Sequence, residues 1–292
     1  MTIEPRSLGT HDGTFHADEV TACALLILCD LIEKRRVIRT RDVEKLARCE
    51  FVCDVGGSYS PKEKRFDHHQ VEYQGPMSSA GMVLLYLRNK KVLSQEEYHH
   101  FKSLLFDGID AHDNGLDPQL PGTTTYSGVI ANFTPVHRNA TDAELDAAFF
   151  AAVDFALGHL ERMLERFRYT QSCRSLVEQA MRGDGICLYF EQSIPWLESF
   201  FDLGGLQHPA QFVIMPAGSH WKLRGIPPSM ADKMSVRYPL PLAWAGLNEH
   251  DLQKVSEIPG AIFCHKGRFI SIWKTKEDAV LAMEKVLKKE AV

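Results

Sequence analysis

The chain has 292 residues, 45% of them hydrophobic and 24% charged, which is typical of a soluble globular protein with one large domain or two smaller ones. Its formal net charge of -5 excludes a protein that coats nucleic acid through bulk charge, because non-specific phosphate binding requires an excess of lysine and arginine. No apolar run has the length of a transmembrane helix and no secretory signal is visible, so we expect a cytoplasmic protein without a membrane partner. Seven cysteines occur without a CxxC pair, and we expect reduced, mostly buried thiols.

The first 140 residues have the pattern of an α/β domain. A polar segment over 9–18 leads into a helix expected over 19–34, which is apolar on most of its faces. Short strands expected within 35–42 and 50–55 complete the rhythm of a βαβ unit, and such a unit implies a mainly parallel sheet. After a turn-rich loop, two further helices are expected, over residues 75–90 and 93–115.

From residue 141 onwards the pattern of the sequence changes. Residues 141–182 form a long helical stretch, with a cap expected at Thr141 or Asp142. Beyond it, short β-like runs are separated by glycine and proline, and an amphipathic helix is expected at the end of the chain. We therefore predict three parts: an α/β domain over 1–140, a helical connector over 141–185 and a smaller α+β domain over 186–292.

Acidic residues and histidines gather at the expected strand ends and helix ends of the first domain. These motifs are His11-Asp12, His16-x-Asp18, Asp54, Asp67-His68-His69 and Asp110-x-x-Asp113. In an open parallel sheet the carboxyl ends of the strands form the ligand crevice, so we expect these segments to converge there. A single Asp after a strand is more often a turn residue or a helix N-cap. The occurrence of all these motifs in one domain is what favours a metal site.

The chemistry of such a set explains why these residue types occur together. Carboxylate oxygens suit Mn²⁺ or Mg²⁺, and imidazole shifts the preference towards Mn²⁺, Fe²⁺, Co²⁺ or Zn²⁺. Two ions about 3.5–4 Å apart can activate a water and stabilise an in-line displacement at phosphorus. The motifs GxSxG, GxxxxGK[ST] and GxGxxG are absent, which argues against a serine nucleophile, an NTPase and a dinucleotide enzyme. Ser79, at the start of an expected helix, is a candidate contact for a phosphate.

The ordered set of motifs resembles the DHH phosphoesterase superfamily, which includes single-strand exonucleases, oligoribonucleases and manganese-dependent pyrophosphatases. More narrowly, GTHDGTFHADE, RTRD, CDVGG, RFDHHQ, SSAGMV and IDAHDNG are similar to the Myg family of 3′–5′ RNA exonucleases. The later segments RYPLPLAWAGL and IPGAIFCHKGRFI also resemble that family, so the resemblance covers nearly the whole chain. It implies an α/β DHH-type catalytic domain that holds a metal pair, and a C-terminal domain that closes over the substrate.

The resemblance also implies roles for individual residues. Metal binding falls on His11, His16, Asp18, Asp54, Asp67, His68 and one of Asp110 and Asp113. By the same resemblance Asp67 bridges the two ions, and His68 binds one of them. His69 supports a ligand or contacts the scissile phosphate. A ligating histidine usually needs a carboxylate or carbonyl on its other nitrogen, and Asp12 is a candidate for that partner.

One position departs from the superfamily pattern. The wider superfamily usually has Asp where His16 stands, so this chain has less negative charge at one ion. The departure leaves the identity and the number of the metals open. We expect two ions, with Mn²⁺ as the first expectation and Mg²⁺ as the alternative.

The C-terminal domain offers candidate groups for substrate binding. Arg224, Arg237 and His265 are expected to contact the substrate phosphates, because the guanidinium fork of arginine matches phosphate oxygens. A surface ion pair is the alternative interpretation for each arginine. Trp221 and Trp244 could stack on a base, but a place in the core is the favoured interpretation for both.

These observations predict a metal-dependent phosphoesterase that uses a metal-activated water. The expected substrate is RNA or a short oligonucleotide, cut from the 3′ end, and the cutting direction comes from the family resemblance alone. A small-molecule phosphatase or pyrophosphatase acting on a small phosphate ester is the first alternative. A metal-binding regulatory protein without turnover is the second. The sequence leaves the oligomeric state open.

Overall fold

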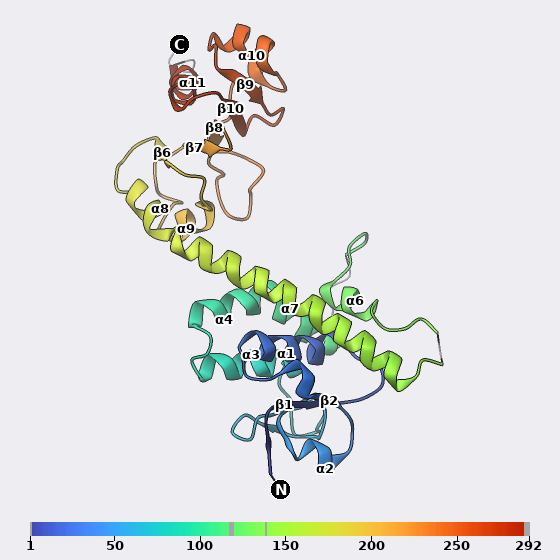
Figure 1. Cartoon of the computed structure of the whole chain (residues 1–292). Helices are drawn as coiled ribbons and strands as arrows, with labels where there is room; N and C mark the ends of the chain where they lie inside the picture. The colour runs from blue at the N-terminus through green and yellow to red at the C-terminus, as the bar shows by residue number, and fades with distance from the viewer. Residues whose placement is uncertain (1, 117–119, 138, 289–292) are drawn as a thin grey trace. The chain divides into compact units, whose positions relative to one another are not determined.

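The computed structural model describes residues 2–116, 120–137 and 139–288 of the chain (Figure 1). It divides into two compact units, Met1–Phe167 and Arg168–Val292, called unit 1 and unit 2 below. The division falls within the long helix α7 (Asp142–Ser172), which covers most of the predicted connector. Of the two caps expected, Thr141 is the one observed: the Glu144 amide donates to Thr141 Oγ1, and the Thr141 amide donates in return to Glu144 Oε2.

Unit 1 is built on a five-stranded sheet. Its strands are β1 (Glu4–Thr10), β2 (Val37–Arg39), β3 (Cys49–Cys53), β4 (Tyr59–Ser60) and β5 (Arg65–Phe66). The strand order is β2-β1-β3-β5-β4. All neighbouring strands pair in parallel except β4, which runs antiparallel to β5, so the predicted parallel α/β domain is confirmed. The parallel strands β1, β3 and β5 end at one edge, in register through the pairs Gly9–Val52 and Cys53–Phe66.

Strand β1 lies between β2 and β3, yet no strand was expected from its sequence. Its buried residues include Ser7, Gly9 and Thr10, and these give no apolar run. A Cβ atom on Gly9 would lie 2.6 Å from Leu46 Cδ2, so glycine lets the short helix α2 (Val43–Leu46) approach the sheet closely. Ser7 Oγ accepts a hydrogen bond from the Glu50 amide on β3 at 2.9 Å. The strand therefore depends on small and polar residues for its packing.

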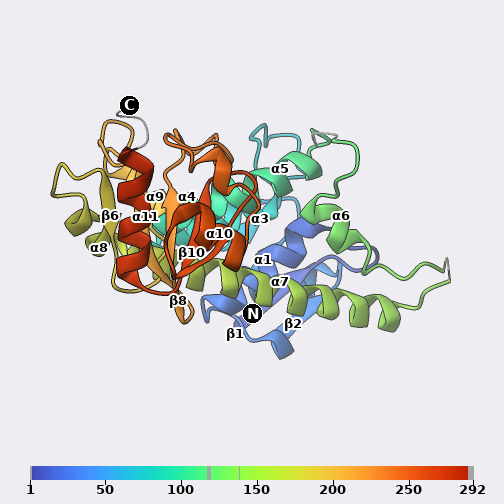
Figure 2. The same cartoon turned by 90° about the horizontal axis from the view of Figure 1, so that it is seen from above.

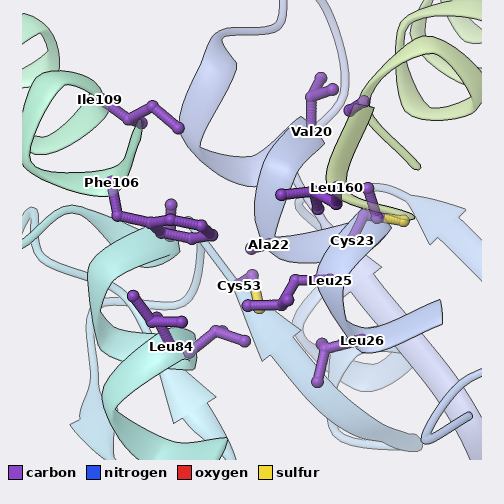
Figure 3. Close-up of a cluster of buried hydrophobic side chains, with 14 of the residues drawn as sticks. Val20, Ala22, Cys23, Leu25, Leu26, Cys53, Leu84, Phe106, Ile109 and Leu160 are labelled. Carbon is purple, nitrogen blue, oxygen red and sulfur yellow. The ribbon is translucent and has the colours of Figure 1, made fainter. Parts of the chain in front are cut away.

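The other helices of unit 1 enclose its core, some packed against the strands of this sheet and the rest packed against those helices. They are α1 (Ala17–Leu28), the 3-10 turn η1 (Lys34–Arg36), α3 (Ser79–Asn89), α4 (Gln95–Phe101), the π-helical turn η2 (Lys102–Phe106), α5 (Asp107–Asp113) and α6 (Tyr126–Ala131). Figure 3 shows side chains of the core cluster from five elements: Leu25 of α1, Cys53 of β3, Leu84 of α3, Phe106 of η2 and Leu160 of α7. The helices expected over 75–90 and 93–115 are present, and the second contains η2.

Unit 2 is built on a second five-stranded sheet. Its strands are β6 (Cys187–Tyr189), β7 (Phe212–Ala217), β8 (His220–Gly225), β9 (Ala261–Cys264) and β10 (Ile270–Trp273). Its helices are α8 (Arg174–Ala180), α9 (Leu197–Asp202), the 3-10 turn η3 (Leu242–Trp244), α10 (Glu249–Ser256) and α11 (Lys276–Lys288). In the strand order β6-β7-β8-β10-β9, only β6 and β7 pair in parallel, which confirms a smaller α+β domain. Helix α11, red in Figure 2, packs against β7, β8 and β10.

The tryptophans and cysteines of the chain occupy structural positions. Trp244 is fully buried in the core of unit 2, and Trp221 packs half-buried against the same cluster. All seven cysteines are thiols rather than disulfides, and six of them are buried, as expected. Among the described residues, no helix combines the length and the apolar character that crossing a membrane requires.

Candidate metal centre

Three parallel strands of unit 1 are each followed directly by a residue that the sequence predicts as a metal ligand. His11 follows β1, Asp54 follows β3 and Asp67 follows β5. Helix α1 begins beside them with His16 as its N-cap, and α5 ends at Asp113. Because parallel strands end at one edge, residues that are far apart in the sequence meet there. The structure therefore shows the convergence of segments that the motifs predict.

His11 is buried and lies between two carboxylates. Its Nε2 atom is 3.1 Å from Glu19 Oε1 and 3.2 Å from Asp54 Oδ2. Its Nδ1 atom is 2.9 Å from the main-chain carbonyl of Asp12, and the tautomer that donates this hydrogen bond presents the lone pair of Nε2. Asp12 thus offers His11 a carbonyl partner, whereas its carboxylate is half-exposed and pairs with Arg41 at 3.2 Å.

Glu19 belongs to this group, although the sequence motifs did not single it out. The side chain is fully buried, and it accepts hydrogen bonds from the His16 amide at 2.8 and 3.0 Å. It occupies the third position of α1, where a glutamate completes a capping box. The signal in the sequence was this acid three residues after His16, at the start of an apolar helix. Glu19 therefore holds the start of α1 and faces His11.

Asp54 is the carboxylate shared most widely in the site. One oxygen lies 3.2 Å from His11 Nε2, and the other lies 3.3 Å from His68 Nε2 and 3.3 Å from Ser79 Oγ. Its backbone has φ +59°, a left-handed conformation that is costly for a residue with a side chain. The strained backbone turns the carboxylate of a strand-end residue back towards the other candidate ligands.

The structure separates the roles of the two acids on α5. Asp113 Oδ2 lies 3.0 Å from His68 Nε2, so this carboxylate faces the candidate ligands. Asp110 instead accepts hydrogen bonds from the Ser78 amide at 3.0 Å and the Ser78 hydroxyl at 2.7 Å. A Cβ atom on Gly81 would lie 2.3 Å from Asp110 Oδ2, so glycine is needed for this close approach. Asp110 thus holds the N-terminus of α3, and Asp113 is the better candidate ligand.

Asp67 and His69 form a pair beside the other groups. Asp67 Oδ1 lies 2.8 Å from His69 Nδ1, and Asp67 Oδ2 accepts a hydrogen bond from the Gly57 amide at 2.6 Å. The Asp67 side chain is buried, whereas that of His69 is 63% exposed. Both oxygens of Asp67 therefore already have partners, and His69 is the member of the pair that solvent and ligands can reach.

Ser79 is fully buried behind Asp54. Its hydroxyl donates to the Phe66 carbonyl at 2.8 Å and lies 3.3 Å from Asp54 Oδ1. The hydroxyl thus connects the end of β5 with Asp54. Its contact with a substrate phosphate stays a prediction, and the observed hydrogen bonds give Ser79 a supporting role.

Three overlapping groups of side chains have ligand atoms within 4.8 Å of one another. Asp54 belongs to two of these groups, and His16 also belongs to two, so the groups form one continuous centre. Asp67 belongs to none of them. The groups are His11, His16, Glu19 and Asp54; Asp54, His68 and His69; and His16, Asp18 and Asp113.

Asp18 provides the physical test of whether these residues fit a metal. The residue is 1% exposed, and among the described residues neither of its carboxylate oxygens has a hydrogen-bond partner. Burial raises the pKa of Asp18 well above its usual value, and the charges of Asp54, Glu19 and Asp113 raise it further. A buried carboxylate without a donor or counter-charge is costly, and a divalent cation among these acids removes that cost. The donor set, oxygen with some imidazole, suits Mn²⁺ or a similar ion.

The histidines respond to the same concentration of acids. Burial alone would lower the pKa of His11, but hydrogen bonds to Asp54 and Glu19 raise it to about 10. Asp113 and Asp54 raise the pKa of His68 to about 10. Burial opposes ionisation of Asp54, and its contacts with His11 and His68 outweigh burial and hold its pKa well below the usual value. Without a metal, protons on these imidazoles supply positive charge that the acids require.

A cavity of about 750 Å³ opens over this centre, within the size range of ligand pockets. Its lining includes His11, His16, Arg41, Asp54, Asp67 and His69. A reacting group in the cavity can therefore reach the candidate ligands and the exposed ring of His69.

The candidate substrate groups of unit 2 differ from one another in their surroundings. Arg224 is half-buried on β8, and burial lowers its pKa. Lys222 lies two residues before it, and among the described residues no carboxylate forms an ion pair with either cation. Arg237 donates to the carbonyls of Gly205, His208 and Ala210 at 2.7–3.1 Å, so its guanidinium ties two loops together.

His265 follows β9, as expected for a residue at a strand end. Its Nδ1 atom accepts a hydrogen bond from the Gly267 amide at 3.0 Å, and its ring lies 4.5 Å from that of Phe269. Arg224 and His265 thus keep donor groups open to ligands, whereas Arg237 is occupied by the fold.

Known proteins resemble this chain over nearly its whole length. The model of the MYG1 exonuclease family, described as "Uncharacterised protein family (UPF0160)", matches residues 7–287. A MYG1 protein of Chlamydia muridarum is 51% identical over 288 residues, which cover 99% of this chain and 99% of that protein. The MYG1 exonuclease of Homo sapiens is 34% identical over 323 residues, covering 95% of this chain and 85% of that protein. Among solved structures, RecJ from Thermus thermophilus in complex with Mn²⁺ matches with a TM-score of 0.27 and 13% identity, covering 97% of this chain and 52% of that one.

Proposed function

The chain belongs to the MYG1 exonuclease family, and on this premise we propose that it is a metal-dependent phosphoesterase that removes nucleotides from the 3′ end of RNA or short oligonucleotides. The observation that carries the proposal is the buried Asp18 carboxylate, which has no hydrogen-bond partner among the described residues and lies among further acids and histidines. The family name supplies the reaction class, and this donor set supplies the need for a cation.

The proposal assigns two ions to the centre. Residues His11, His16, Glu19 and Asp54 would hold one of them. The other ion would lie among Asp18, Asp54, His68 and Asp113. Asp54 would contribute to both sets, because one of its oxygens faces His11 and the other faces His68, whereas Asp67 holds His69 and the Gly57 amide. Divalent ions bound here would lower the pKa of a water and stabilise negative charge at phosphorus.

His69 is the protein group that we assign to the scissile phosphate. Its ring is exposed to the cavity, and a hydrogen bond of 2.8 Å between its Nδ1 atom and Asp67 Oδ1 fixes the ring orientation. A histidine oriented by a carboxylate can donate a hydrogen bond from Nε2 to a phosphate oxygen or to the leaving oxygen. Asp67 acts in this proposal through His69 and through the Gly57 amide that it holds.

Unit 2 is the proposed substrate-binding part of the chain. Lys222 and Arg224 occupy alternate positions on β8 and therefore share one face of the sheet. The burial of Arg224 without a carboxylate partner among the described residues is the feature that favours an anionic ligand. We place Arg224 and His265 in contact with substrate phosphates, and we leave Arg237 out because its guanidinium already bonds three carbonyls.

A small-molecule phosphatase is the second candidate function. The cavity of about 750 Å³ is large enough to enclose a nucleotide-sized ligand, so a small phosphate ester also fits the centre. The two candidates share the metal chemistry and differ only in the substrate.

A cleavage assay separates these possibilities. A 5′-labelled short RNA is incubated with Mn²⁺, with EDTA, and with the Asp54→Asn variant in Mn²⁺. A ladder that shortens from the 3′ end only with wild-type protein and Mn²⁺ supports the exonuclease. An intact RNA together with Mn²⁺-dependent hydrolysis of pyrophosphate or nucleotides would move the assignment to the phosphatase, and no hydrolysis of either kind would contradict both.

A further inference from the structure

One arginine, Arg41, borders the cavity over the metal centre. Among the described residues that line this cavity, Arg41 is the only lysine or arginine, and the titratable groups around it are histidines and carboxylates. Arg41 lies in the segment RTRD, in the loop after β2. A guanidinium is a hydrogen-bond donor without an acceptor atom, so Arg41 does not serve as a metal ligand. Its role is therefore not explained by metal binding.

The backbone on both sides of Arg41 is fixed. The Thr40 amide donates to the Thr10 carbonyl at 2.7 Å, which continues the pairing of β2 with β1. The next residue, Asp42, caps α2 by accepting from the Glu44 amide at 2.9 Å. Arg41 is thus held at the carboxyl edge of the sheet, while its side chain remains 65% exposed at the cavity.

The ion pair that Arg41 forms with Asp12 is weak enough for a ligand to replace it. Its Nε atom lies 3.2 Å from Asp12 Oδ1, and the Asp12 side chain is itself 50% exposed. Exposed ion pairs of this kind contribute little to stability. The two terminal nitrogens of Arg41 make no hydrogen bond or ion pair with any described residue. A guanidinium in this state can offer its fork to a phosphate, which binds two parallel N–H groups.

The strand order places Arg41 to one side of the candidate metal ligands. Along the carboxyl edge β2 lies outside β1, and the candidate ligands follow β1, β3 and β5. Neighbouring strands are about 4.8 Å apart, so Arg41 lies beyond His11. It is therefore to one side of the two metal ions that Asp54 would help to hold. Resting on the proposed function, we infer that Arg41 binds the phosphate adjacent to the scissile phosphate of an oligonucleotide substrate.

Two substrates distinguish a neighbouring phosphate from the scissile one. A short RNA has phosphates on both sides of the cut, whereas bis-p-nitrophenyl phosphate has a single phosphodiester. Arg41→Ala removes a bidentate, charge-assisted interaction with the neighbouring phosphate. We therefore expect kcat/KM on the RNA to fall about 10- to 100-fold, mainly because KM rises. The same variant should hydrolyse bis-p-nitrophenyl phosphate within about twofold of wild type. Arg41→Lys keeps the charge without the fork and should lie between the two.

Arg35 gives a matched control. It is an exposed arginine of η1 that pairs with Glu33 at 2.7 Å, and it does not line the cavity. Arg35→Ala removes the same charge from the same unit and should leave both substrates unchanged. Fluorescence anisotropy with a phosphorothioate RNA that resists hydrolysis supplies a second readout, in which only the Arg41 variants should bind more weakly.

Equal kcat/KM of Arg41→Ala and wild type on the RNA would overturn the inference. An equal loss on both substrates would also overturn it, because Arg41 would then act on the scissile phosphate or on the metal centre. If wild type hydrolyses neither substrate, the proposed function fails, and the anisotropy measurement decides on Arg41: unchanged RNA affinity in Arg41→Ala overturns the inference, and a loss of about 10- to 100-fold supports it.

Discussion

The two units of this chain use sheets of different topology, and this difference decides how their polar residues are arranged. In unit 1 the parallel strands β1, β3 and β5 end at one edge, so the residues that follow them meet in one centre. In unit 2 most neighbouring strands run antiparallel, and their ends alternate between the two edges. In this chain, motifs at strand ends thus form a shared site in the sheet whose strands are parallel.

The candidate residues follow this difference. Those of unit 1 contact one another at about 3 Å. They include Asp18, a buried carboxylate whose neighbours are further acids. Those of unit 2 are separate: Arg224 lacks a described carboxylate partner, Arg237 bonds loop carbonyls, and His265 bonds a turn amide. Changes in unit 1 should therefore affect metal and chemistry together, and changes in unit 2 should affect either substrate affinity or stability.

The largest expected effect is at Asp54. Asp54→Asn removes the charge that both halves of the centre share, and we expect a loss of Mn²⁺-dependent hydrolysis on the order of a thousandfold. Asp67→Asn should lose less, about 10- to 100-fold, because it acts through His69 and Gly57. Steady-state hydrolysis measures both, and circular dichroism controls for folding. A greater loss in Asp67→Asn than in Asp54→Asn would support the bridging role that the family resemblance implies for Asp67.

The next effect separates the two acids of α5. Asp113→Asn should weaken Mn²⁺ binding about 10- to 100-fold and leave thermal stability of the metal-free protein nearly unchanged. Asp110→Asn should leave Mn²⁺ affinity nearly unchanged. It should lower the free energy of unfolding by about 1–2 kcal/mol, because the contacts with Ser78 are lost. Isothermal titration calorimetry measures the first quantity and denaturant unfolding the second. Identical behaviour of the two variants would contradict the separation seen in the structure.

Metal addition should stabilise unit 1 selectively. A ligand at a hundredfold excess over its Kd adds about 2.7 kcal/mol to the free energy of unfolding of the unit that binds it. In unit 1 the bound cation would reduce the repulsion among the acids around Asp18. Differential scanning calorimetry with Mn²⁺ and with EDTA should therefore show one transition that moves by several degrees. A shift of both transitions by the same amount, or of neither, would contradict a centre confined to unit 1.

The smallest effects divide the arginines of unit 2. Arg224→Ala should raise KM for RNA about tenfold without loss of stability, because the side chain has no described acidic partner. Arg237→Ala should cost about 1–3 kcal/mol of stability, because three carbonyls lose their donor, and it should leave KM unchanged in the folded protein. Kinetics and urea unfolding on the same preparations test both. A raised KM in Arg237→Ala would restore its predicted substrate role.

Much of unit 1 could be predicted from the sequence, because motifs at strand ends and apolar helices carry strong local signals. Strand β1 could not, since Ser7, Gly9 and Thr10 are buried for packing reasons that depend on α2 and β3. The choice between Asp110 and Asp113 also required the structure, because both occur on one helix and only the position of α3 distinguishes them. Glu19 was not recognised as part of the site, because a helix-capping acid and a metal-facing acid have the same sequence pattern.

In unit 2 the sequence predicted strands and the final helix but not the surroundings of single arginines. Arg224 and Arg237 lie in similar short segments, and their different partners arise from loops that are distant along the chain. Chemistry that depends on tertiary partners of this kind has no local signal. The roles of Arg224 and His265 therefore remain predictions.

The most direct test of the central claim is the position of bound metal. We would grow crystals with Mn²⁺ and measure anomalous differences at the manganese edge. A centre in which Asp54 contributes to both metal sites predicts two peaks about 3.5–4 Å apart in unit 1, one on each side of the Asp54 carboxylate, with Asp113 beside one of them. A peak held by Asp67 with Asp54 free, or no peak at this edge of the sheet, would contradict it.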